Sequence, residues 1–161
     1  MKVKGDLQIK NQRLGFVVQQ VESVITSASG TTATPAVDNS IPQITEGDQV
    51  LTLTITPQRI GNIVLLDVVG MANHSSGGSV IVSIHRVGTS DALETTYFYA
   101  IAGGGVPFSL TYRDTATGVA AVEYTVRVGV NLGGTYALGF GTGYFGTANR
   151  VILRATEYSL S

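Results

Sequence analysis

The feature that most constrains this chain is the strict alternation of apolar and polar residues from Val122 to Val130. The segment reads Val-Glu-Tyr-Thr-Val-Arg-Val-Gly-Val, so every second residue is apolar. Successive side chains of a β-strand point to opposite faces of a sheet, and this spacing therefore predicts a strand with one buried face. The same alternation runs from Gly15 almost to the end of the chain, interrupted by Gly, Asn, Asp and Ser turns. We therefore expect an all-β protein without a helical scaffold.

Turn-forming residues divide the chain into segments of strand-like composition. The predicted strands are 15–26, 41–44, 49–56, 62–72, 79–87, 95–102, 106–113, 119–132 and 150–158, and segment 136–146 is a Gly-rich stretch. Segment 62–72 is apolar on both faces, which predicts a central strand covered on both sides. Gly133-Gly134 predicts a hairpin turn, because both residues tolerate a positive φ. About eight to ten strands at this spacing favour an antiparallel β-sandwich or jelly roll over residues 15–161.

Composition narrows the classes of function. The 161 residues include no Cys, which excludes disulfides and cysteine-ligated metals. Only 13% of the residues are charged, about half the usual fraction of about 25%. We therefore expect part of the surface to meet protein instead of water. The net charge is −1 and the basic residues are scattered, so we expect no nucleic-acid partner.

The N-terminal segment 1–14 differs from the rest, since it holds four of the ten basic residues. We interpret it as an attachment arm, with a frayed terminus as the alternative. The candidate attachment residues are Lys2, Lys4, Leu7 and Ile9. No apolar stretch follows its lysines, so we expect neither a Sec-type signal peptide nor insertion into a membrane.

Histidines offer the first candidates for chemistry, and the chain has two of them. His74 lies in a Ser/Gly turn beside Ser75, whereas His85 lies in the middle of a predicted strand. A catalytic base needs a nucleophile or carboxylate within reach, and the sequence shows neither that grouping nor metal-type spacing. We expect a solvated turn histidine and a sheet-surface histidine, with a subunit interface as the alternative for His85. We predict no enzyme activity, no cofactor and no metal.

Asp67 interrupts an apolar strand, and burying a carboxylate is costly unless it is paired. We expect Arg86 or Arg127 as its partner, or a place at a subunit interface. The carboxylates in 46–48 and 91–94 lack the pattern of a calcium loop, so we interpret them as solvated turn charges.

Two aromatic segments also stand out. Residues 139–143 read Gly-Phe-Gly-Thr-Gly, but no helix follows, so a phosphate loop is rejected. We favour a close approach of backbones there. The alternative is a flexible loop that displays Tyr144 and Phe145. In Tyr97-Phe98-Tyr99 the two tyrosines share one strand face, and we expect core or intersubunit packing.

Three stretches together resemble a known family. They are 14–21 (Leu-Gly-Phe-Val-Val-Gln-Gln-Val), 51–57 (Leu-Thr-Leu-Thr-Ile-Thr-Pro) with 62–68, and 150–158 (Arg-Val-Ile-Leu-Arg-Ala-Thr-Glu-Tyr). Their order resembles the C-terminal head domains of bacteriophage tail fibres and related virion fibres, which share the topology of complement and tumour-necrosis-factor-like trimeric jelly rolls. The resemblance covers about residues 14–159. It implies a homotrimer that is assembled in the host cytoplasm and exposed on the exterior of a virion.

From this resemblance we expect a fibre or spike head that contacts a host-surface glycan or protein and docks to other virion proteins through its N-terminal arm. The candidate receptor-contact residues are His74, Ser75, Tyr144, Phe145 and Asn149. The candidate trimer-interface residues are Asp67, His85, Tyr97, Tyr99, Tyr124 and Arg127. The alternatives are a capsid decoration trimer without a receptor and a cellular carbohydrate-binding or adhesion module.

Overall fold

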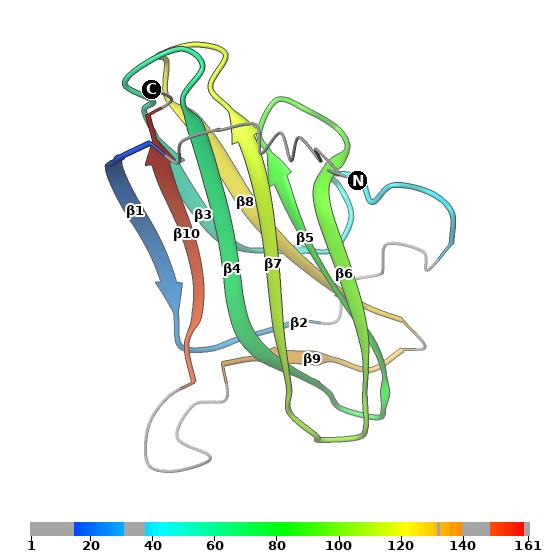
Figure 1. The fold of residues 1–161 in the computed structure, drawn as a ribbon. Helices are drawn as coiled ribbons and strands as arrows, with labels where there is room; N and C mark the ends of the chain where they lie inside the picture. Colours follow the sequence, from blue (N-terminus) through cyan, green and yellow to red (C-terminus); the bar gives the residue numbers. More distant parts are fainter. Residues whose placement is uncertain (1–14, 31–37, 132, 140–148, 160–161) are drawn as a thin grey trace, which may run out of the picture.

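The computed structural model describes residues 15–30, 38–131, 133–139 and 149–159, and in these ranges the chain folds into two antiparallel sheets (Figure 1). The strands are β1 (Val17–Ile25), β2 (Ala28–Gly30), β3 (Asp48–Ile55), β4 (Ile63–His74), β5 (Gly78–Arg86), β6 (Ala92–Ala100), β7 (Val106–Thr115), β8 (Val122–Val130), β9 (Tyr136–Leu138) and β10 (Val151–Tyr158). No helix occurs in these ranges. The all-β, antiparallel fold expected from the alternation is confirmed.

One sheet has six strands and the other has four. The six-stranded sheet has the order β1-β10-β4-β9-β2, with β7 also paired to β4. The four-stranded sheet has the order β3-β8-β5-β6, so β3 and β6 are its edge strands. The sheets form two layers in which β6 of one lies beside β7 of the other (Figure 1).

Alternate residues of the strands fill the space between the layers, as the period of two requires. In β3, Leu51, Leu53 and Ile55 are at most 5% exposed, while Thr52 and Thr54 are exposed. Between β6 and β7 the rings of Phe98 and Phe108 stack at a centroid distance of 5.8 Å. These contacts bury an apolar core that is the main source of stability for a chain without disulfides.

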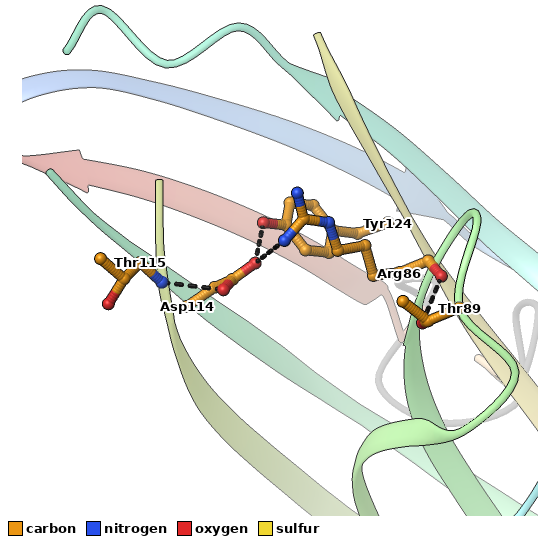
Figure 2. A network of polar contacts seen from close by, with 5 residues as sticks. All are labelled: Arg86, Thr89, Asp114, Thr115 and Tyr124. Atoms are coloured by element: carbon orange, nitrogen blue, oxygen red, sulfur yellow. Dashed lines mark hydrogen bonds and ion pairs between the residues drawn. The ribbon is translucent and has the colours of Figure 1, made fainter. Parts of the chain in front are cut away.

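Polar ties also join the two layers, and one of them is drawn in Figure 2. Asp114 of β7 accepts a hydrogen bond of 2.5 Å from the Tyr124 hydroxyl of β8 and lies 3.4 Å from Arg86 of β5. Burial, reinforced by Asp114, raises the pKa of Tyr124 well above its ordinary value. Since Tyr124 and Arg86 both come from the opposite sheet, this carboxylate links the two layers.

Two further carboxylates accept side-chain hydrogen bonds, and the first of them also joins the two layers. The Tyr136 hydroxyl of β9 donates to Asp48 of β3 at 2.9 Å. Glu157 of β10 is fully buried and accepts from the Asn62 and Gln19 side chains at 2.6 and 2.5 Å. Burial opposes ionisation of Glu157, but these hydrogen bonds outweigh it and lower the pKa of the carboxyl.

Several predicted boundaries change. Segment 41–44 forms one isolated bridge, Gln43 to Asp91, in place of a strand. Strand β2 lies in a segment expected to be a loop, and of segment 136–146 the described part is β9. Gly133 and Gly134 have positive φ, 72° and 98°, but their turn joins β8 of the four-stranded sheet to β9 of the six-stranded sheet, so the predicted hairpin is wrong. Strand β4 is central, but it is covered on one face only, since Val69 is 44% exposed.

Candidate binding surface

Tyr97 and Tyr99 are the most prominent aromatic pair on the described surface. They are 63% and 64% exposed on β6, while Phe98 between them points inward to its stack with Phe108. Strand alternation sends the two tyrosines to the same face, and β6 is an edge strand. Core packing of the tyrosines was therefore a wrong expectation, and intersubunit packing stays a prediction.

The turn 75–77 lies beside Tyr99. Tyr99 pairs in register with Ser79, at the start of the strand that follows this turn. Gly77 has a φ of +82°, and a methyl group built on it would lie 3.5 Å from the Tyr99 hydroxyl oxygen. Ser75 and Ser76 are exposed. We call Tyr97, Tyr99 and the turn 75–77 the tyrosine surface; it combines two aromatic rings with hydroxyl groups and carries no charged side chain.

His74 supports this turn from below. It is 0% exposed, so the expectation of a solvated, receptor-contacting histidine was wrong. Its Nδ1 accepts from the Ser76 amide at 3.3 Å, which assigns the proton to Nε2, 3.0 Å from the Asn131 carbonyl. The imidazole thus accepts from the Ser76 amide and donates to the Asn131 carbonyl, two backbone groups at this turn. Ser75 itself is exposed, and its hydroxyl accepts from the Thr135 amide at 2.9 Å.

His85 lies on the outer face of the four-stranded sheet, yet it is also 0% exposed. A sheet-surface histidine was therefore a wrong expectation, and a side chain buried within one chain offers no area to a neighbouring subunit. The Ser83 hydroxyl lies 2.9 Å from its Nε2. Burial, followed by the nearby Arg127, lowers the pKa of His85 to about 4. A substrate cannot reach this Ser–His pair, because Ser83 is only 1% exposed.

The remaining interface candidates have partners within the chain. The Arg127 guanidinium donates to the carbonyls of Glu46 and Gly47, both at 2.8 Å. Tyr124 is 1% exposed and belongs to the tie in Figure 2, so it is a core residue, contrary to its expected interface role. Tyr124 is buried because strand alternation places it on the same face of β8 as the core residues Val126 and Val128.

Asp67 accepts a hydrogen bond from the Thr111 hydroxyl at 2.9 Å. An arginine partner at Arg86 or Arg127 was a wrong expectation, because the first lies beside Asp114 and the second binds carbonyls 46 and 47. Asp67 lies on the outer face of the six-stranded sheet, where it is partly exposed and pairs in register with Arg154. A subunit interface at Asp67 stays a prediction.

The other predicted residues divide in two groups. Asn149 is half-buried, and its side-chain amide lies 3.8 Å from the Met71 sulfur. The residues outside the described ranges are Tyr144, Phe145, Lys2, Lys4, Leu7 and Ile9.

Sequence reasoning predicted a short strand at 41–44 but missed the attachment of segment 41–47 to the four-stranded sheet. The segment bridges to the start of β6 through Gln43 and is fastened to β8 by Arg127. The available signal was Arg127, a charged residue between two valines of β8, whose guanidinium donates to backbone carbonyls. No group of three or more His, Asp or Glu side chains that could hold a metal occurs within the described ranges. In the same ranges, no helix is long and apolar enough to cross a membrane.

Comparison with known proteins adds little to this surface. No family model and no curated protein matches the chain. Among solved structures, one titled "CBM4 structure and function" is 15% identical over 70% of this chain and 66% of its own, with a TM-score of 0.42. The CBM36-1 domain of a xylanase from the hindgut metagenome of Trinervitermes trinervoides is 14% identical over 83% and 96%, with a TM-score of 0.40. Tailspike protein 4 of bacteriophage CBA120 is 14% identical over 77% and 19%, with a TM-score of 0.33. The functional argument therefore rests on this chain's own residues.

Proposed function

We propose that this chain is a non-enzymatic binding domain, displayed as a homotrimer on the exterior of a bacteriophage particle, whose tyrosine surface contacts a host-surface glycan. The observation that carries the binding role is the exposed pair Tyr97 and Tyr99 on edge strand β6. Large aromatic side chains that lie together on one exposed strand face form a patch of the kind that marks interaction sites.

The chemistry of the surface fits a neutral glycan. Such a ligand presents apolar C–H faces that pack on aromatic rings, and hydroxyl groups that exchange hydrogen bonds. The tyrosine hydroxyls and the exposed Ser75 and Ser76 supply the polar part, and the surface holds no charge that the ligand must neutralise. The underlying His74 and Gly77 hold the turn in place, so little ordering is needed on binding.

Multivalency supplies the affinity that a small open surface lacks. One shallow site binds weakly, but three on a rigid trimer, on many trimers per particle, raise the effective affinity by about two to four orders of magnitude. The partly exposed outer face of the six-stranded sheet, with Val24 and Val69 each 44% exposed, supports a contact between subunits. Light scattering at micromolar concentration tests the trimer, and a monomer would refute it.

Binding is tested with the purified full chain on a glycan array. Tyr97→Ala and Tyr99→Ala should each weaken binding by at least about tenfold, and the double variant should abolish it. Phe16→Ala is the matched control, because Phe16 is an aromatic residue that is 87% exposed outside the tyrosine surface. If no glycan is bound, or the double variant binds as the parent does, the tyrosine surface has another role.

A capsid decoration trimer remains the second candidate, favoured by the same exposed tyrosines, since aromatic residues also anchor protein interfaces. Labelled protein separates the two: adsorption to host cells supports the fibre head, and tight binding to capsids without adsorption supports decoration. A cellular carbohydrate-binding module would give the same array result but would be absent from purified particles.

A further inference from the structure

Residues 41–47, which we call the strap, cross the outer face of the four-stranded sheet between two attachment points. At one end, the Pro42 carbonyl accepts from the Ala92 amide at 2.8 Å and the Ile44 amide donates to Ser90 at 2.6 Å. At the other end, Arg127 of β8 holds the carbonyls of Glu46 and Gly47. A methyl group on Gly47 would lie 2.8 Å from the Val128 carbonyl oxygen, so the strap rests directly on β8.

A polar cluster lies beside the Arg127 attachment. His85 and Thr125 are register partners on β5 and β8, and both are at most 1% exposed. The His85 Nδ1 and the Thr125 Oγ1 are buried without a hydrogen-bond partner in the described part of the chain. Native proteins rarely leave buried polar atoms in this state, and such atoms mark strain or a functional role. The other ring nitrogen is already committed to Ser83.

Electrostatics keep His85 neutral at ordinary pH. Burial and the Arg127 guanidinium both disfavour a second positive charge here, and they lower the pKa of His85 to about 4 against the weaker, opposite effect of Glu46 on the strap. The β6 residue paired with His85 is the uncharged Ala92. The charged groups facing the imidazole are therefore Arg127 and Glu46, and these two also form the attachment of the strap.

We propose that the strap is an acid-released cover, which protonation of His85 detaches from β8. A proton taken from solvent turns His85 into a cation with two N–H donors, of which one has no acceptor. The new charge repels the Arg127 guanidinium and so weakens its hydrogen bonds to the carbonyls of Glu46 and Gly47. Once it is free of the strap, the Arg127 side chain can turn into solvent, which relieves the repulsion, and displacement of the strap admits water to the buried imidazole.

Hydrogen exchange of the full chain, corrected for intrinsic rates, tests the proposal at about pH 7 and about pH 4. The protected amides of the strap region, Ile44, Glu46 and Ala92, should exchange at least about tenfold faster in acid, while those of β10 stay protected. In His85→Gln, which cannot gain the charge, the strap should exchange at the same rate at both pH values. Unchanged strap exchange in the parent, or an equal acid response in His85→Gln, would overturn the proposal.

A measurement on the unaltered protein covers the case in which His85→Gln does not fold. The imidazole resonances of His85 should titrate at about pH 4, and the strap amide resonances should shift with the same midpoint. Titration of His85 near the ordinary value of 6.5 would refute this release of the strap by acid, as would movement of the strap without titration of His85.

Discussion

The outer faces of the two sheets are built from similar alternating strands, but their surroundings differ. On the six-stranded sheet, Val69 is 44% exposed and Arg154 is partly exposed. On the four-stranded sheet, Ile81, His85 and Thr125 are at most 3% exposed, although they alternate with residues that point into the core. Alternation determines which residues share a face, whereas contacts with a separate segment decide whether a part of that face, such as the part around His85, is covered.

The two arginines of these faces show the consequence. Arg154 donates to Glu22 at 2.6 Å, and both side chains are more than a third exposed. Arg127 donates to two backbone carbonyls of the strap. Water can replace the first partner but cannot fully replace the second, so the same residue type has different energetic weight on the two faces.

The largest expected difference is in acid. The folded-state pKa of His85 is lowered to about 4 from 6.5, so the unfolded chain binds more protons between these values. The contribution of neutral His85 to the free energy of unfolding is complete above about pH 6.5. It should fall by up to about 3 kcal/mol as the pH approaches about 4. Urea denaturation across this range measures the slope, and His85→Gln should flatten it. A slope that His85→Gln leaves intact would assign the acid sensitivity elsewhere.

Glu157 gives a second, lower pH window. Its pKa is lowered from 4.5, so its contribution is present above that value and is lost as the pH falls below it. Glu157→Gln should therefore flatten the denaturation profile only in the more acidic range. A change in slope near neutral pH would contradict this separation.

Arg127→Ala should destabilise the protein by about 2–3 kcal/mol, because two charge-assisted hydrogen bonds to the strap are lost. Arg154→Ala is the matched change on the other face and should cost less than about 1 kcal/mol. Urea denaturation at neutral pH compares them. Equal costs would mean that the strap adds no stability to the face it crosses.

Substitutions of two threonines, Thr125 and Thr111, should change the free energy of unfolding in opposite directions. Thr125→Val removes a buried hydroxyl that has no hydrogen-bond partner, and should stabilise by about 0.5–1 kcal/mol. Thr111→Val removes the donor to Asp67 and should destabilise by up to about 1 kcal/mol. Thermal unfolding measures both. Destabilisation by Thr125→Val would reveal a bound water molecule at this hydroxyl.

The smallest effect on stability is expected at the tyrosine surface. Tyr97→Ala and Tyr99→Ala remove side chains that are more than 60% exposed, so the unfolding free energy should change by no more than about 0.5 kcal/mol. A larger loss would mean that the rings support β6, and would weaken their assignment to ligand binding.

Alternation predicted the inward faces correctly, as the burial of Leu51, Leu53 and Ile55 shows. It failed for polar residues whose neighbours come from distant segments. His74 was expected in solvent because its turn is polar, but Asn131 and the turn 75–77 enclose it. Asp67 was expected beside Arg86 or Arg127, but sheet order placed Thr111 and Arg154 next to it. Such pairings depend on register between strands far apart in the chain.

The sequence by itself determined the class of fold. Apolar residues at every second position come together on one face in a β-strand and not in a helix, so only a sheet can bury them together. It also determined that Tyr97 and Tyr99 share a face and that the core is held without disulfides. Only the tertiary structure decided that the strap lies on part of the four-stranded sheet, since the strap and its Arg127 anchor come from segments about 80 residues apart. Burial of His85 and exposure of the tyrosines follow from that packing, because solvent access depends on the whole fold and not on local pattern.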